Sequence, residues 1–174
     1  MGEDVLFFEA GALPPGCQAR VLTETDIPAA LALCRGNPLF YEHCPPPPSA
    51  EGLRSDMTAL PPGKTLADKR FLGLWRDGRL TALLDLILGY PAEDTAWIGF
   101  FMTARETQGR GEGSALAESV LRRLAELGYV RVELAYVKGN PQSAVFWRKN
   151  GFRPTGREIT GEAYTAVVTR RELR

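Results

Sequence analysis

The feature that most constrains the fold is a glycine-rich junction at residues 103–114, between a strand pattern and a helix pattern. The segment reads T-A-R-E-T-Q-G-R-G-E-G-S. Ala96 to Thr103 predicts a strand, and Ser114 to Leu127 places its apolar residues on one helical stripe. Glycines at such a junction let the backbone approach a ligand closely. The free N–H groups and the dipole at the helix start therefore predict an anion site that suits a phosphate or pyrophosphate.

The rest of the chain predicts an α/β (α+β) fold: a mixed, mostly antiparallel central sheet of about six to seven strands flanked by about four helices. Apart from the junction, the expected strands are 20–22, 71–75, 80–88, 130–137, one from 152 and 164–169, and the expected helices are 26–35, 49–60 and 141–150. Asp77-Gly78 is a strong two-residue hairpin signal between two of the strands. At 174 residues, the chain has the usual length of one domain. We expect a single domain over residues 1–174, with residues 1–16 as a loose lead-in.

Composition argues against several classes of function. Lys plus Arg and Asp plus Glu both number 21, so the net charge of zero predicts no nucleic-acid or membrane partner. No window approaches the ~20 apolar residues of a membrane helix. With one histidine and no C-x-x-C pair, we expect no metal. Cys17, Cys34 and Cys44 are expected to be reduced thiols of a cytoplasmic protein.

Three interpretations of the junction compete on its residues alone. A Walker loop is excluded because no lysine follows the glycines. A dinucleotide fingerprint fits Gly109 and Gly111 but meets Ser114 at its third position; Glu133 then stands near the place of a ribose-binding acid. Only ~40 residues follow Glu133, too few for the rest of a doubly wound sheet. The third interpretation is a glycine-rich helix entry that binds no ligand.

A second segment favours one answer. Gln108 to Gly113 matches the pattern [RQ]-x-x-G-x-[GA], and Asn140 to Phe152 reads N-P-Q-S-A-V-F-W-R-K-N-G-F. Together, these motifs resemble the GNAT superfamily of acetyl-CoA-dependent N-acetyltransferases over roughly 80–154. The resemblance implies the GNAT-like acyl-CoA N-acyltransferase fold and acetyl-CoA as co-substrate. It also implies direct attack by an amine in a ternary complex.

The resemblance implies a role for each matching residue. Backbone N–H groups of the loop would hold the pyrophosphate, and the end of the preceding strand would bind the pantetheine arm through its main chain. A backbone N–H there would also polarise the thioester carbonyl. Gln108 opens the loop, Asn140 would contact the cofactor and also cap a helix, and Glu112 must point away from the phosphates. The implied cofactor-binding residues are Phe101, Met102, Thr103, Gln108, Gly109, Arg110, Gly111, Glu112, Gly113, Ser114 and Asn140.

One departure from the family concerns the general acid. Many relatives place a tyrosine seven residues after the asparagine, where this chain has Trp147. An indole N–H donates a hydrogen bond but is not a usable acid. A module that binds acetyl-CoA without catalysis therefore stays as an alternative. A covalent acetyl-cysteine route is disfavoured because neither motif contains a cysteine.

The acceptor side has weaker candidates, because an amine must lose a proton before it attacks. Asp85 interrupts the apolar run 83–87 and is predicted to lie near Gly99; it is our candidate base, unless it pairs with an arginine or lies at an exposed edge. Tyr136 is a candidate acid or pocket wall, unless it packs in the core. Residues 41–43, Tyr-Glu-His, could bind a cationic or polar acceptor, unless they form an ordinary surface loop. The acceptor, a small-molecule or peptide amine, is not identified. The oligomeric state stays open too, although dimers are common in this family.

Overall fold

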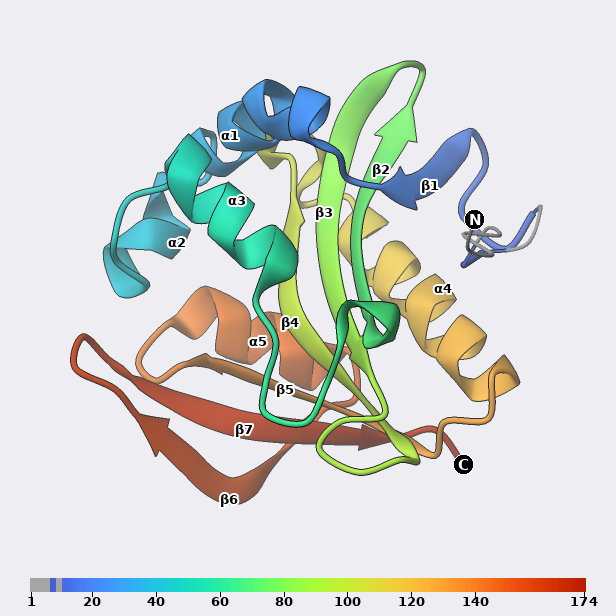
Figure 1. Ribbon diagram of the computed structural model, residues 1–174, viewed down its shortest axis with the longest axis vertical. Helices are drawn as coiled ribbons and strands as arrows, with labels where there is room; N and C mark the ends of the chain where they lie inside the picture. The colour runs from blue at the N-terminus through green and yellow to red at the C-terminus, as the bar shows by residue number, and fades with distance from the viewer. Residues whose placement is uncertain (1–6, 9–10) are drawn as a thin grey trace.

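The computed structural model describes residues 7–8 and 11–174, and its centre is a seven-stranded sheet (Figure 1). The strand order is β1-β2-β3-β4-β5-β7-β6, and only the β4–β5 pair is parallel. The strands are β1 (Cys17–Val21), β2 (Lys69–Arg76), β3 (Arg79–Leu88), β4 (Thr95–Thr103), β5 (Arg131–Val137), β6 (Arg153–Thr160) and β7 (Thr165–Glu172). The predicted mixed, mostly antiparallel sheet is confirmed.

The helices are α1 (Ile27–Arg35), α2 (Pro38–His43), α3 (Ala50–Thr58), α4 (Glu112–Glu126) and α5 (Pro141–Lys149). The sequence predicted four of them. Ser49 caps α3 by accepting a hydrogen bond from the Gly52 N–H, as serine commonly does at this position. The short helix α2 was not predicted. Its first residue is Pro38, whose fixed φ and missing N–H suit a first helical position, so the proline begins a helix here as well as following one.

The β2–β3 hairpin closes through the predicted turn. Asp77 and Gly78 have φ values of 51° and 75°, the two positive values that a type I′ turn requires. Further along, a β-bulge between Leu74 and Trp75 shifts the pairing by one residue. Asp85 consequently lies opposite Phe71, not opposite Arg70 as an unbroken register would place it.

Both faces of the sheet are covered, which explains why β3 is almost continuously apolar. Leu83 belongs to a core with α1 and α3, and Leu84 belongs to a core with α4 and α5. In Figure 1, α3 accordingly lies in front of the sheet, and α4 lies behind it. Residues 1–6 and 9–10 of the expected lead-in lie outside the described residues, whereas Phe8 is buried in the α4–α5 core.

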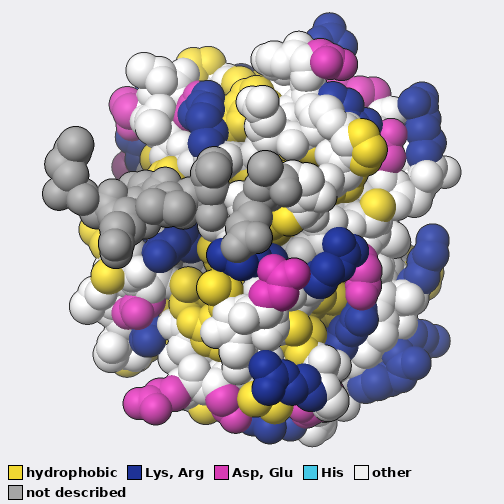
Figure 2. Space-filling model, turned by 90° about the vertical axis from the view of Figure 1, so that its right-hand side faces the viewer, with side chains coloured by type: hydrophobic (Ala, Val, Ile, Leu, Met, Phe, Trp, Pro, Cys, Tyr) yellow, Lys and Arg dark blue, Asp and Glu magenta, His cyan; other side chains and the backbone are white. Residues whose placement is uncertain are grey.

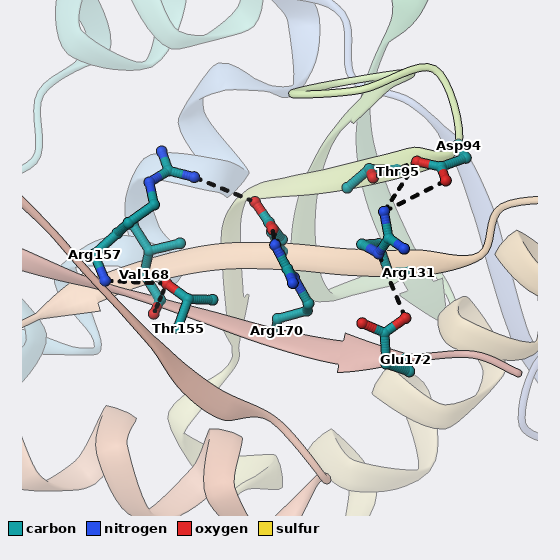
Figure 3. Close-up of polar contacts among 9 residues, drawn as sticks. Asp94, Thr95, Arg131, Thr155, Arg157, Val168, Arg170 and Glu172 are labelled. Atoms are coloured by element: carbon teal, nitrogen blue, oxygen red, sulfur yellow. Dashed lines mark hydrogen bonds and ion pairs between the residues drawn. The ribbon is translucent and has the colours of Figure 1, made fainter.

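Ion pairs fasten β5 to its neighbours (Figure 3). Glu133, 1% exposed, accepts two hydrogen bonds from the Arg170 guanidinium of β7, at 2.6 and 2.8 Å. Arg131 lies within 3.4 Å of both Asp94 and Glu172. These contacts hold β5 against β7 and the start of β4.

Side chains of both charges are interspersed over the face that carries α4 (Figure 2), in agreement with the zero net charge. Among the helices that the structure describes, none has the length and hydrophobicity needed to span a membrane.

Candidate active site

The site begins where β4 and β5 part. The two strands pair from Thr95 and Arg131 up to Ile98 and Leu134, although β4 continues to Thr103. A cavity of about 840 Å³ occupies the opening and extends from the glycine loop to α2 and α3. Backbone groups of β4 that face this opening have no β5 ladder partner beyond Ile98, so an extended ligand can take the place of the missing strand.

The glycine loop lies at one end of this cavity. Gly109 and Gly111 have φ values of 80° and 79°, which glycine adopts at little cost, and Gly111 is the N-cap of α4. A Cβ added to either glycine would meet no atom within 4 Å, so the space in front of the loop backbone is open. An open cradle of backbone N–H groups at a helix start fits a pyrophosphate.

Most of the predicted cofactor-binding residues line the cavity, namely Phe101, Met102, Thr103, Gln108, Gly109, Gly111, Gly113 and Ser114. The Gln108 side chain is already engaged, because its amide donates to the Thr103 carbonyl and to Asn37 Oδ1. It therefore ties the loop to the end of β4. Arg110, Glu112 and Asn140 are not among the lining residues; Glu112 points to Arg76, 3.6 Å away, as its expected direction away from the phosphates requires.

Asn140 caps α5. Its Oδ1 accepts from the backbone N–H groups of Gln142 and Ser143, and the residue is 2% exposed. Trp147 lines the cavity and lies in an aromatic cluster, with ring centroids 4.8–5.5 Å from those of three phenylalanines. These partners are Phe101, Phe146 and Phe152. The tryptophan thus packs behind the β4 end, where its indole supports the cavity wall.

Asp85 lies where β4 bends toward the cavity. A bulge in β4 leaves Gly99 beside it, and a Cβ on Gly99 would be 2.6 Å from Asp85 Oδ2, so only glycine accommodates the carboxylate there. The predicted proximity to Gly99 is confirmed. The carboxylate is not unpartnered: Lys69 Nζ lies 3.0 Å from each oxygen and donates to Oδ2. The partner is therefore a lysine, not the arginine that we had considered.

The electrostatics of Asp85 suit a proton acceptor. Burial raises the pKa of this carboxyl, the Lys69 ammonium lowers it, and the nearby Asp56 charge raises it again, for a net increase. Although Lys69 is as close to Oδ1 as to Oδ2, Oδ1 makes no hydrogen bond with a described residue. A second cavity of about 260 Å³ also borders Asp85, so the carboxylate lies between two cavities.

The other acceptor-side candidates differ in whether they line the cavity. Tyr136 is half-buried and lines the cavity, so it is a wall of the site while its ring also contacts the core. Tyr41 lines the cavity as well, and burial raises its pKa. Glu42 and His43 are not lining residues. Of the 41–43 cluster, the tyrosine alone is therefore placed to meet an acceptor.

Sequence reasoning missed Lys69 and Asp56. Lys69 opens β2, and only the unpredicted bulge brings it beside Asp85. Asp56 lies three residues after the buried Leu53 on α3, so it borders the buried face of that helix. The three-residue spacing from Leu53 was the sequence signal that could have identified Asp56. Within the described part of the chain, no three His, Cys, Asp or Glu side chains gather as a metal site, and all three cysteines are free.

The fold and the site together define a mixed-sheet protein with an anion-binding strand–loop–helix and a strand opening beside it. Residues 37–152 match the acetyltransferase (GNAT) family. The chain therefore belongs to the GNAT acetyltransferase family. A search of curated proteins gave no match.

Three solved structures illustrate the likeness. An acetyltransferase from Thermus thermophilus is 23% identical, with 90% of this chain and 96% of that chain covered and a TM-score of 0.68. The PaiA N-acetyltransferase from Thermoplasma acidophilum, in complex with coenzyme A, is 17% identical, with 90% and 98% covered and a TM-score of 0.66. The ribosomal-protein-S18-alanine N-acetyltransferase from Escherichia coli is 17% identical, with 90% and 94% covered and a TM-score of 0.64. Because these sequence identities are low, the similarity to the three structures shows a shared fold alone.

The dinucleotide interpretation fails on the same geometry. A doubly wound domain needs several parallel strands, whereas one parallel pair is present in the described sheet. Glu133, the acid that would bind a ribose, is buried and bound by Arg170.

Proposed function

We propose that the chain is an acetyl-CoA-dependent N-acetyltransferase that acts on a primary amine by direct attack in a ternary complex. The observation that carries this proposal is the continuous cavity from the glycine loop, past the unpaired end of β4, to the Asp85 carboxylate. A donor laid along β4 would place its reactive end beside a carboxylate with a raised pKa. A second candidate, a module that binds acetyl-CoA without catalysis, rests on Trp147 at the position of the family's tyrosine.

The main chain of residues 109–114 would hold the pyrophosphate, and that of residues 101–103 the pantetheine arm. When bound, acetyl-CoA supplies a thioester: the amine nitrogen bonds to the acetyl carbon, the carbon–sulfur bond breaks, and an amide and free CoA result. Asp85 takes the proton that the ammonium must lose before attack, and the smaller cavity offers that proton a route to solvent. Tyr136, across the opening, is the candidate proton donor to the leaving thiolate.

Binding and turnover test the proposal separately. Acetyl-CoA and CoA should raise the melting temperature by mass action, whereas NADH should not. An acceptor screen with a free-thiol readout should then find acetyl-CoA consumption that depends on an added amine. A rise in melting temperature with NADH, and none with acetyl-CoA or CoA, would contradict CoA binding. CoA binding without release of thiol on any amine would favour the non-catalytic module.

The Asp85→Asn variant tests the base. Its turnover should fall on the order of 10²–10⁴, the usual contribution of general base catalysis, with acetyl-CoA affinity unchanged. The deficit should shrink as the pH approaches the pKa of the acceptor amine, because the amine then arrives neutral. Asp94→Asn, which removes an exposed carboxylate at the start of β4, is the control. If the two variants have the same turnover per folded molecule, Asp85 is not the base.

A further inference from the structure

The acceptor end of the large cavity has a chemistry of its own. We define the acceptor chamber as the part of this cavity walled by α2, α3, β3, β4, β5 and the turn between β6 and β7. Its aromatic side chains are Phe40, Tyr41, Trp97, Phe100, Tyr136 and Tyr164, and its acidic side chains are Asp56 and Asp85. Aromatic faces and carboxylates both attract organic cations.

The charges of the chamber do not cancel. Among the described residues that line the whole cavity, the charged ones are Asp56, Asp85 and Lys149. Lys69 neutralises Asp85, and Lys149 is exposed at the end of α5. Asp56, exposed to solvent at the wall, makes no hydrogen bond or ion pair with another described residue. Burial raises the pKa of Asp56 and the Lys69 ammonium lowers it, so Asp56 is the carboxylate of the chamber that feels a positive charge but has no direct ion pair among the described residues.

The chamber also lacks a partner for an anion. No arginine is among the described residues lining the large cavity. Arg157 borders the separate, smaller cavity and lies 3.9 Å from Glu133. An acceptor with a carboxylate beside its amine would bring that carboxylate toward Asp56 and Asp85, where repulsion and desolvation oppose it.

A contact bounds the chamber on the side away from β4. Tyr164, in the turn between β6 and β7, lies beside the Cys44 thiol after α2, and the interaction with this thiol, together with burial, raises the pKa of Tyr164 to about 12. In Figure 1 the tip of the β6–β7 hairpin accordingly reaches toward α2. Pro45 to Pro48 line the cavity next to this contact. Because the contact between Tyr164 and Cys44 bounds the chamber on this side, it favours a compact acceptor over a polypeptide.

We infer that the acceptor is a small organic cation: a primary amine without a carboxylate, bound as its ammonium between Asp56 and the aromatic walls. The inference rests on the proposed function and narrows its substrate class. Asp56 attracts and positions the cation, and Asp85 then takes its proton.

Acceptor pairs that differ by one carboxylate test the inference. Tyramine and tyrosine, tryptamine and tryptophan, and cadaverine and lysine are compared by free-thiol release and, with CoA present, by melting temperature. Each amine should exceed its amino acid in kcat/KM by roughly tenfold or more, and should stabilise the CoA complex where the amino acid does not. Equal or higher kcat/KM values for the amino acids would overturn the inference. The case against it would be stronger still if Arg157→Gln abolished the activity toward the amino acids. Better use of a peptide with a free N-terminus, or no stabilisation by any amine, would also overturn it.

A matched pair of variants on α3 locates the charge. Asp56→Asn should raise the KM of the amine by roughly 10- to 100-fold, the value of a hydrogen bond to a charged group, and leave the KM of acetyl-CoA unchanged. Glu51→Gln removes the same charge from an exposed position on the same helix that does not line the cavity, and should change neither constant. Equal behaviour of the two variants would refute the role of Asp56. Failure of acetyl-CoA itself to bind would instead refute the proposed function.

Discussion

The buried Lys69–Asp85 pair gives the most quantitative prediction. The side chains are 3% and 12% exposed, and Lys69 Nζ lies 3.0 Å from each Asp85 oxygen. At this distance, an effective dielectric constant of ~20 gives an attraction of roughly 5 kcal/mol. Removing one partner of a buried pair costs about 3–5 kcal/mol, because the other charge stays buried and uncompensated. Lys69→Met should therefore lower the melting temperature by roughly 6–20 °C, at 2–4 °C per kcal/mol for a domain of this size.

The loss should depend on pH with a definite sign. Burial raises the pKa of Asp85 even in the parent protein, and Lys69→Met removes the ammonium that lowers it. Since the folded-state pKa then exceeds the unfolded one, the folded state holds the proton more tightly. Stability is lost as the pH rises through the folded-state pKa. The melting temperatures of parent and variant should consequently converge toward acidic pH.

Thermal melts between pH 5 and 8 of Lys69→Met, Asp85→Asn and the double variant measure this coupling. The double variant should lose less than the sum of the single losses, because neither charge is left alone. Lys64→Met is the control, since Lys64 and Asp68 are 3.5 Å apart and more exposed; it should cost about 1 kcal/mol or less. Additive losses, or a Lys69→Met variant that melts with the parent, would refute the reasoning.

Three further substitutions probe the cavity. Gly99→Ala should displace the Asp85 carboxylate, which its Cβ would approach to 2.6 Å, so turnover should fall by on the order of tenfold or more while calorimetry shows unchanged acetyl-CoA affinity. Gly111→Val should cost roughly 1–2 kcal/mol of stability, because a φ of 79° disfavours residues with a side chain. It should also weaken the binding of CoA by a larger factor than this backbone strain explains. Normal CoA affinity in this variant would show that the phosphate site is elsewhere. Trp147→Phe should lower the melting temperature but keep both limbs of the pH–rate profile, and loss of a limb would show that the indole takes part in proton transfer.

The sequence allowed the elements and the glycine loop to be predicted, because their signals are local. Asp77-Gly78 sets a turn, Ser49 and Asn140 cap helices, and three glycines mark the loop. The helix α2 was missed because a proline such as Pro38 indicates the end of a preceding helix as readily as the start of a new one. Six residues are also too few to show a helical period.

Register was the step that local signals did not determine. An unbroken hairpin through Asp77-Gly78 would place Asp85 opposite Arg70, which suits the arginine pairing that we weighed against a catalytic role. The bulge at Leu74 and Trp75 instead places Phe71 opposite Asp85, so that Lys69, two residues before Phe71, lies on the same face as Asp85. Since β3 is apolar on both faces, its sequence shows no alternation of polar and apolar residues from which a one-residue shift of the β2–β3 register could be recognised. Gly73, which leaves the space that the Trp75 ring fills, was the available signal, because an isolated glycine within a strand often marks a bulge.

We expect CoA to lie along the opening between β4 and β5 with its pyrophosphate on the glycine loop, and a crystal structure of the protein with CoA would show this. The pyrophosphate oxygens should lie within hydrogen-bonding distance of backbone N–H groups of residues 109–114, and the pantetheine arm should be hydrogen-bonded to the main chain of residues 101–103. CoA bound elsewhere, or a pyrophosphate held by side chains away from the loop, would contradict this expectation.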